Sequence, residues 1–458
     1  MYDYVVIGGG PTGIAVVTML REMRERGSKI ALLEKASTLG GCWRVEWTSD
    51  GLYSEHAPRV MTTTYHRFRR LLKHYGVNFD YDEVYKNSFG IYKKIFAKLS
   101  ANDIFKILSG FILSRFIESK DTVEDFMEHL SASGAEAMYI LSVTLANVPR
   151  KVMIQDIFDE MYKYHGSFVQ LKDPHWYETI QKELQKTVDV RTGCEAYYVT
   201  KTENGNFVVE CSKGSFQTRE VILALPPSPL ISILSKSDAA IRDSWGKIEK
   251  LDEFSSESTY HSIGFQIHFS EFVRFPDEWC KFCELDWNMI VLPVSNYLNE
   301  YSKLDQIKSV WSGCIIDQDK YSTKLKKRVH ECSMEEIETE VIRQLKLTDV
   351  TKRFTFTSGL TRSTSGYYES KDTGFIRGKD GTLPFEGNAD KIYLVGPVNH
   401  KGVITMESAL EEACKFMKYK FKDPNSCRLL EPKQKFLTFR NLLLGFVFII
   451  ILNEIMKK

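Results

Sequence analysis

The chain has 458 residues, 43% of them hydrophobic and 26% charged, which is typical of a folded globular protein and, at this length, predicts two domains. Its 61 basic and 60 acidic residues nearly cancel, which argues against a nucleic-acid-binding protein. Nine cysteines without a framework spacing favour a reducing compartment over a disulfide-stapled fold.

The N-terminal region predicts a βαβ unit. We expect a buried strand over Tyr2–Ile7, a glycine turn over Gly8–Gly13, a helix over Ile14–Arg26 and a second strand over Ser28–Glu34. Because a core strand begins at the second residue, no signal or transit peptide is expected. This order of elements is that of a dinucleotide-binding fold.

Three glycines and one acid give this unit its chemistry. Gly8 permits the tight turn, Gly10 lets the backbone approach a pyrophosphate, and Gly13 allows the helix to pack closely on the sheet. The helix N-terminus then presents N–H groups to the phosphates. Glu34 ends the second strand, where a carboxylate accepts hydrogen bonds from the ribose of an adenine nucleotide. NAD and FAD both carry such a nucleotide, so this unit alone fits either cofactor.

The segment after Glu34 carries two adjacent glycines and an arginine. Gly40 and Gly41 let the chain pass close to a cofactor, and Arg44 is a fixed cation that could reach a phosphate. Here the sequence resembles the flavin-containing amine oxidase superfamily, which includes monoamine and polyamine oxidases, protoporphyrinogen oxidase and the carotenoid desaturases. Its members carry a glycine fingerprint, an acid and a Gly-Gly-Arg element. In this chain Arg44 comes three residues after Gly41.

A second element, Glu55 to Arg59, resembles the Glu-x-Gly-Pro-Arg element of the protoporphyrinogen oxidase branch. That resemblance places Arg59 along the flavin. Ala57 stands where the family has glycine, a change that matters if the position needs a positive φ. The alternative interpretation is an ordinary polar loop.

Residues 62 to 166 predict a mainly helical insertion, because apolar residues recur at helical spacing throughout. In the resembled family such an insertion covers the active site and sometimes enters a membrane. The stretch Ile104–Ile117 is apolar enough to do so, although such a stripe more often belongs to a core.

The nucleotide-binding domain is expected to resume near Val188. A strand over 195–200, an Asn-Gly turn, a partner strand over 207–211 and a buried strand over 220–225 follow in order. The same order occurs in the resembled family, where the first strand contacts the adenine through its backbone. That resemblance assigns the contact to Ala196.

The region from about 230 to 384 predicts a sheet with helices. Residues 260–269 alternate as a strand with one apolar face, and 288–294 and 307–316 are also strand-like. Cys280 and Cys283 have the spacing of a thioredoxin-type redox pair, but two structural thiols are the favoured interpretation. No metal site is predicted.

The last motif is a strand over Ile392–Gly396, a loop and a helix that starts near Thr405. A second helix N-terminus aimed at the sheet suits the electron-rich edge of a reduced flavin. By the family resemblance, flavin contacts come from the backbone of Gly396, Gly402, Val403 and Ile404. Thr405 stands where many amine oxidases have a cage tyrosine. Threonine has no π face, which weakens the prediction of an amine substrate.

The C-terminal segment predicts a membrane anchor. The uninterrupted apolar run over Leu442–Leu452 spans only about 16 Å as a helix, but the stretch from Phe436 to Met456 reaches roughly 30 Å. Basic residues on both sides favour an anchor over a helix buried in the globule. We therefore expect a cytoplasmic-facing, membrane-associated protein with no nucleic-acid partner.

The predicted fold class is α/β: a Rossmann-type FAD-binding domain interleaved with an α+β substrate domain, followed by the membrane tail. The FAD-binding segments are 1–61, 188–229 and 385–422, the substrate segments are 62–187 and 230–384, and a linker at 423–435 precedes the tail at 436–458.

The resemblance implies an FAD-dependent oxidoreductase with non-covalent FAD. An apolar, aromatic or amine small molecule would give a hydride equivalent to flavin N5, and O2 or another acceptor would reoxidise the flavin. A protoporphyrinogen oxidase-like or isoprenoid desaturase-like enzyme is the more specific alternative. Rab GDP-dissociation inhibitors share the architecture as non-catalytic binding proteins, but the intact glycine fingerprint argues against that class.

Overall fold

The computed structural model describes residues 1–23, 27–84, 97, 99–114, 116–117, 119–144, 147–163, 166–276, 285–370, 374–375 and 381–432. Cys280 and Cys283, interpreted above as structural thiols, and the predicted tail lie outside these residues. Within the described part of the chain, no helix is long and apolar enough to cross a membrane.

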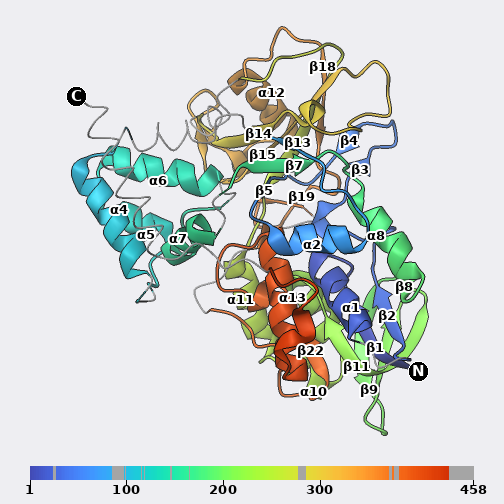
Figure 1. The fold of residues 1–458 in the computed structure, drawn as a ribbon. Coiled ribbons are helices and arrows are strands. Elements are labelled where there is room, and N and C mark those ends of the chain that lie inside the picture. Colours follow the sequence, from blue (N-terminus) through green and yellow to red (C-terminus); the bar gives the residue numbers. More distant parts are fainter. Residues whose placement is uncertain are drawn as a thin grey trace.

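A seven-stranded sheet forms the lower half of the molecule (Figure 1). Its order is β8-β2-β1-β11-β10-β9, and β22 pairs with β11. Strands β1, β2, β8, β11 and β22 run parallel, and β9 and β10 are antiparallel neighbours. The strands span Tyr2–Ile7 (β1), Ile30–Leu33 (β2), Asp189–Arg191 (β8), Ala196–Lys201 (β9), Phe207–Cys211 (β10), Gly214–Leu223 (β11) and Ile392–Leu394 (β22).

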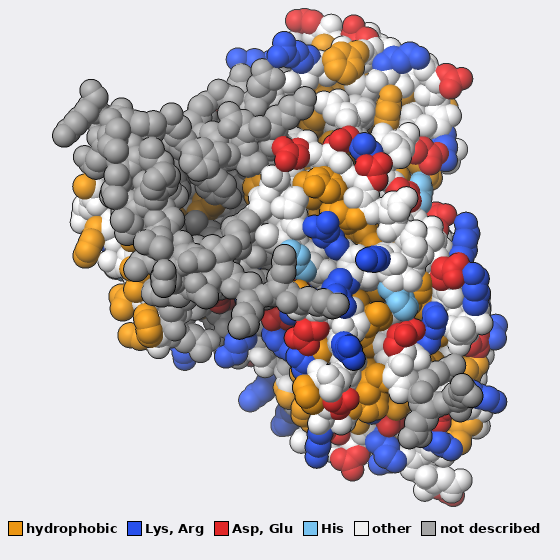
Figure 2. Space-filling model, in the orientation of Figure 1, with side chains coloured by type: hydrophobic (Ala, Val, Ile, Leu, Met, Phe, Trp, Pro, Cys, Tyr) orange, Lys and Arg blue, Asp and Glu red, His pale blue; other side chains and the backbone are white. Residues whose placement is uncertain are grey.

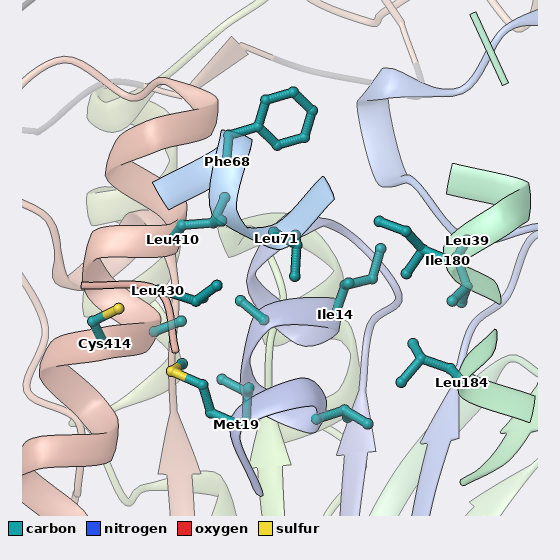
Figure 3. Close-up of a cluster of buried hydrophobic side chains, with 14 of the residues drawn as sticks. Ile14, Met19, Leu39, Phe68, Leu71, Ile180, Leu184, Leu410, Cys414 and Leu430 are labelled. Atoms are coloured by element: carbon teal, nitrogen blue, oxygen red, sulfur yellow. The ribbon is translucent and has the colours of Figure 1, made fainter. Parts of the chain in front are cut away.

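Helices cover both faces of this sheet because its central strands alternate buried residues between two cores. Val6 and Leu32 belong to one core, which contains α1, α2, α8 and α13, while Val5 and Leu33 belong to the other, which contains α9, α10 and α11. Figure 3 shows the first core, where Met19, Leu71, Leu184 and Leu410 come from four different helices. The helices span Pro11–Glu22 (α1), His66–His74 (α2), Trp176–Gln185 (α8), Met406–Phe421 (α13), Pro227–Leu234 (α9), Ala239–Arg242 (α10) and Ile248–Ser258 (α11).

A four-stranded antiparallel sheet of order β14-β15-β13-β18 forms the upper half. The apolar face predicted for the strand at 260–269 packs in the core of this half of the molecule, but the opposite face of β13, which carries Gln266 and His268, is buried as well. These polar side chains have hydrogen-bond partners in the interior. Gln266 Nε2 donates to the carbonyl of Glu55 at 2.8 Å, and His268 Nε2 lies 3.0 Å from the carbonyl oxygen of Tyr53. The elements are Ile263–Phe269 (β13), Met289–Leu292 (β14), Ser309–Ile315 (β15), Lys352–Phe356 (β18) and Met334–Gln344 (α12).

Helices α4, α5, α6 and α7 of the insertion project to one side in Figure 1. They span Ala101–Leu113 (α4), Val123–Met127 (α5), Ala132–Thr144 (α6) and Ile154–Lys163 (α7), and capping boxes start α4 and α5. The expectation of a mainly helical region missed a three-stranded sheet of order β5-β7-β6, because two- to four-residue strands carry too short a pattern to be recognised. These strands are Met61–Thr62 (β5), Tyr81–Glu83 (β6) and Phe168–Leu171 (β7).

Short elements complete the described chain. The two-stranded pairs are Glu46–Trp47 with Tyr53–Ser54 (β3, β4), Thr259–Tyr260 with Gly374–Phe375 (β12, β21), Tyr321–Ser322 with Lys327–Arg328 (β16, β17) and Thr361–Arg362 with Tyr368–Glu369 (β19, β20). The 3-10 turns are Gly41–Trp43 (η1), Val294–Asn296 (η3), Val329–Glu331 (η4), Pro397–Asn399 (η5) and Pro424–Cys427 (η6).

Candidate functional site

The three glycines of the turn between β1 and α1 differ in how closely other atoms approach them. Gly8 has φ +107°, and a Cβ there would lie 2.3 Å from the carbonyl oxygen of Ala224. A Cβ on Gly13 would lie 1.9 Å from the carbonyl oxygen of Gly8, so only glycine allows α1 to approach the strand this closely. A Cβ on Gly10 would meet only the Cα of Gly41, at 3.8 Å. The side of Gly10 that a pyrophosphate would approach is therefore open.

Glu34 lies directly beside this turn. Its Oε2 accepts the N–H of Gly9 at 2.7 Å, and its Oε1 accepts the N–H of Ala36 at 2.8 Å. The side chain is 6% exposed, so these two bonds hold the carboxylate in one position. Each carboxylate oxygen can accept a second hydrogen bond, which leaves capacity for ribose hydroxyls.

The Gly40–Gly41 element packs against the glycine turn. The N–H of Gly40 donates to the carbonyl of Gly9 at 2.9 Å, and both Gly40 and Gly41 have positive φ. A Cβ on Gly41 would lie 3.0 Å from the Cα of Gly10. Arg44 follows, with Nη1 3.7 Å from Glu34 Oε1. Gly41 and Arg44 thus lie next to the predicted phosphate and ribose positions.

Arg59 makes its contacts within the chain. Its guanidinium donates to the carbonyls of Trp43 (2.5 Å) and Arg44, and its Nε lies 3.4 Å from Glu55 Oε2. Burial raises the pKa of Glu55, and the neighbouring Arg59 opposes that rise. These bonds fix the segment that follows Gly41. Ala57 is not among the described residues with positive φ, so its methyl group introduces no backbone strain.

Ala196 begins β9, close to Glu34. The N–H of Cys194, two residues earlier, donates to the carbonyl of Glu34 at 2.9 Å, and the N–H of Gly193 donates to the carbonyl of Ala36 at 2.6 Å. The second nucleotide-binding segment is therefore joined to the ribose end of the first by backbone hydrogen bonds.

The loop between β22 and α13, which contains Gly396 to Ile404, lies next to the start of α1. Gly396 has φ +143°, and a Cβ there would lie 3.5 Å from Thr12 Oγ1 in the first turn of α1. His400 anchors the following loop through Nδ1, which lies 2.7 Å from Glu412 Oε1 on α13; both side chains are 2% exposed. Gly402 has φ +126°, and Val403, 7% exposed, packs in the core of the helical insertion. Ile404 is half-buried, directly before the start of α13.

Helix α13 begins at a second N-terminus. Thr405 caps it, since its Oγ1 accepts the N–H of Ser408 at 3.1 Å. Glu407 instead reaches the start of α2, where it accepts the N–H groups of Arg67 (2.8 Å) and Phe68 (3.1 Å). Glu407 Oε1 also lies 3.2 Å from Arg67 Nη1. Glu407 therefore holds the starts of α2 and α13 together.

Two residues that the sequence did not indicate lie near this second N-terminus. Tyr65 is 5% exposed and its hydroxyl bonds to the Thr405 side chain; burial and the nearby Glu160 both raise its pKa. Glu160, on α7, has a buried Oε2 without a hydrogen-bond partner among the described residues. Burial, and then the neighbouring Asp156, raise the pKa of Glu160 to about 8, against the opposing effect of Lys163. A single glutamate within an amphipathic helix carries no motif by which to find it.

These residues fit an extended dinucleotide such as FAD. The parallel strands β1, β2, β11 and β22 end at one edge of the sheet, which is where such folds bind their ligands. A Cβ on Gly10 would meet no atom closer than 3.8 Å, two hydrogen bonds fix Glu34 beside the turn, and α13 supplies a second helix N-terminus toward which the flavin end of such a cofactor could extend.

Comparisons with known proteins agree with this geometry. Residues 6–75 match the family model of the NAD(P)-binding Rossmann-like domain. A search of curated proteins found no significant match. Among solved structures, an oxidoreductase from Methanosarcina mazei matches with a TM-score of 0.61 and 13% identity, over 91% of this chain and 100% of that chain.

Two further structures show how varied the chemistry of this fold is. Cyclohexylamine oxidase from Brevibacterium oxydans matches with a TM-score of 0.56 and 11% identity, over 92% of this chain and 100% of its own. A CLA-producing fatty acid isomerase from P. acnes matches with a TM-score of 0.55 and 12% identity, over 92% of this chain and 98% of its own. The predicted resemblance is confirmed for the fold: residues 6–75 match a Rossmann-like domain, and the chain shares its overall fold with these solved structures, an amine oxidase among them.

Proposed function

We propose that the protein is an FAD-dependent oxidoreductase that takes a hydride equivalent from a small apolar or aromatic substrate. The observation that carries this proposal is the meeting of three distant segments at one sheet edge, where a Cβ on Gly396, in the loop before α13, would lie 3.5 Å from Thr12 Oγ1 in the first turn of α1. A cofactor that extends between two helix N-termini needs this arrangement, whereas a mononucleotide would need only the first.

The chain's own residues would bind and orient FAD rather than perform its chemistry. FAD supplies the hydride acceptor when it is bound. Gly10 gives the pyrophosphate access to the N-terminus of α1, and Glu34 accepts the ribose hydroxyls. The start of α13 places positive potential at the flavin edge that becomes electron-rich. The insertion, which packs on Val403, would exclude water from the substrate.

The substrate end favours an apolar or aromatic compound over an amine. Thr405 offers no π face to a cation, and its side chain already bonds Ser408 and Tyr65. Glu160 is the one feature that favours an amine, because an ionised buried carboxylate would attract a cation. At neutral pH, however, the raised pKa of Glu160 keeps it protonated.

Two glycine substitutions test the cofactor site. Gly10→Val should abolish flavin retention, because its methyl groups extend into the space for the pyrophosphate, while the Tm stays close to that of the flavin-free wild type. Gly13→Ala should instead lower the Tm, because its Cβ would overlap the Gly8 carbonyl; overpacking of this kind costs about 1–3 kcal/mol. Absorbance of the purified proteins and thermal unfolding measure both effects. A fully flavin-loaded Gly10→Val protein would contradict the proposed site.

Colour separates the enzyme from the binding-protein alternative. Yellow wild-type protein, or protein that becomes yellow with added FAD, supports the oxidoreductase, whereas protein that cannot be loaded supports a module resembling the Rab GDP-dissociation inhibitors. Anaerobic addition of benzylamine, putrescine, protoporphyrinogen IX or a carotenoid precursor then identifies the substrate class, because only a substrate bleaches the flavin. We expect the porphyrinogen or the isoprenoid to act rather than the amines.

We also propose that the protein associates with a cytoplasmic membrane surface. Apolar side chains are exposed at the outer edge of the insertion (Figure 2): Phe105, Leu113, Phe116 and Ile117 are between 54% and 76% exposed. Helix α4, which carries Phe105 and Leu113, buries Ile107 and Phe111 in the core of the insertion, so the stretch at Ile104–Ile117 is partly core and partly surface. Together with the apolar run at Leu442–Leu452, this surface supports contact with lipid.

A further inference from the structure

Two buried cysteines from different segments are in direct contact. Cys194 Sγ lies 2.9 Å from Cys211 Sγ, although the residues are 17 positions apart. Their side chains are 1% and 7% exposed, and both belong to the core that lies against α9, α10 and α11. A disulfide has its sulfurs about 2.05 Å apart, so the two sulfurs need to approach each other by less than about 1 Å to reach bonding distance.

The backbone holds the two cysteines together without help from the sulfurs. Cys211 ends β10, opposite Ala196 of β9, and the register of the two strands shifts between Glu210 and Cys211. The N–H of Ser212 donates to the carbonyl of Glu195 at 2.9 Å, and the N–H of Glu195 donates to Ser212 Oγ at 3.0 Å. The hairpin that contains Cys211 is thus fixed beside the segment that contains Cys194.

We propose that Cys194 and Cys211 form a disulfide when the protein meets a small two-electron oxidant such as hydrogen peroxide. The sulfur of one thiolate attacks one peroxide oxygen, the O–O bond breaks, and a sulfenic acid and one water form. The second sulfur then attacks the sulfenic sulfur, the S–O bond breaks, and a second water leaves. Two thiols lose two electrons and two protons in total, and one peroxide is reduced to two waters.

Other described thiols are engaged differently. Cys427 Sγ donates to the Glu431 carboxylate at 2.8 Å, and Cys332 Sγ donates to the carbonyl of Arg328 at 3.3 Å. Cys211 Sγ can also donate to the carbonyl of Gly214 at 2.8 Å, a bond that oxidation would remove. Burial raises the pKa of Cys194 to about 12, so the reaction should be slow at neutral pH and faster in alkali.

The disulfide would act on the ribose end of the cofactor site. The N–H groups of Gly193 and Cys194 donate to the carbonyls of Ala36 and Glu34, so this loop and the end of β2 move together. A covalent link from Cys194 to β10 would restrain that movement. This consequence, unlike the disulfide itself, rests on the proposed FAD binding.

Thiol counting on the full-length protein tests the disulfide. Reduced protein should take up nine alkyl groups after denaturation, and protein treated with hydrogen peroxide should take up seven, with a peptide map that links Cys194 to Cys211. Cys211→Ser should abolish the link, and Cys332→Ser should retain it. Protein that stays fully reduced, or that forms only another link such as Cys414 to Cys427, would overturn the proposal. Because the wild-type protein gives this result by itself, a variant that does not fold leaves the test intact.

FAD release tests the consequence. Oxidised wild-type protein should lose flavin more slowly on dilution than reduced protein, and Cys211→Ser should release it at one rate under both conditions. Equal rates in a wild-type protein that carries the mapped disulfide would refute the effect on the cofactor end. A colourless protein with the mapped disulfide would refute the proposed function and leave the disulfide standing.

Discussion

Residues with local roles could be predicted from the sequence, and residues whose role depends on distant neighbours could not. Gly13 belongs to a motif because the Gly8 carbonyl that excludes its side chain lies only five residues away. Asp156 and Lys163 are close to Glu160 in sequence but form no motif with it, and Tyr65 comes close to it only in the folded chain. The role of Arg59 depends equally on the carbonyls of Trp43 and Arg44, which only the fold brings to it.

The buried carboxyl of Glu160 should make stability depend on pH. Its pKa is raised to about 8 in the fold, so the folded protein holds a proton that the unfolded chain loses near the ordinary glutamate pKa. The contribution of Glu160 to the free energy of unfolding is fully present below the ordinary glutamate pKa and is lost as the pH rises towards 8. Glu160→Gln should therefore flatten the fall in Tm between pH 5 and pH 9 and make the protein more stable than the wild type at pH 9.

Thermal unfolding of both proteins across this pH range measures the effect. Glu128→Gln is the matched control, because Glu128 is an exposed carboxylate in the same insertion. Parallel Tm curves for the wild type and Glu160→Gln would show that Glu160 does not hold a proton in the folded state.

Elements whose apolar pattern repeats over many residues could be predicted from the sequence. Very short strands could not, and neither could the burial of a strand on both faces. Helices α1 and α12 follow an apolar stripe, and the hairpin of β9 and β10 follows an Asn-Gly turn. The two-residue β5 offers no period to detect. In β13 the polar positions face a second buried layer rather than water, so alternation predicted the strand but not its burial.

The contact between α2 and α13 should depend on the buried pair Arg67 and Glu407. Glu407→Gln leaves the guanidinium without its charge partner, and breaking a buried pair of this kind costs about 3 kcal/mol in the free energy of unfolding. Arg67→Met should cost a similar amount. The double variant should cost less than the sum, because no unpaired buried charge remains.

Urea unfolding of the four proteins gives this coupling energy. Glu335→Gln serves as the control, since Glu335 is an exposed glutamate in the first turn of α12. Strictly additive costs would mean that the two side chains stabilise the helices independently.

At the scale of the whole molecule, the interleaved fold was predictable because each nucleotide-binding segment carries its own signal. Helices α2 and α8, which lie within 62–187, pack on the seven-stranded sheet. This packing could not be predicted, because the apolar stripe of each helix shows only that one face is buried, not which element covers it. The proposed membrane association likewise rests on side chains of the insertion whose exposure only the folded structure shows.

Removal of the residues after Pro432 tests that association. The shortened chain should remain folded, because Leu430, fully buried against α1 and α13, is retained. It should lose most of its binding to liposomes of phosphatidylcholine and phosphatidylserine, measured by sedimentation, while its flavin content stays unchanged. Undiminished sedimentation would rule out the tail as the anchor.

The pairing of β22 with β11 sets the timing of folding during synthesis. Residues 392–394 add to a strand that ends at residue 223, so the sheet edge stays unpaired until nearly the whole described chain has left the ribosome. An unpaired edge of Val221, Ile222 and Leu223 is prone to aggregate. A nascent chain stalled before β22 should therefore bind chaperones strongly, and FAD should join the protein only after translation has passed Thr405.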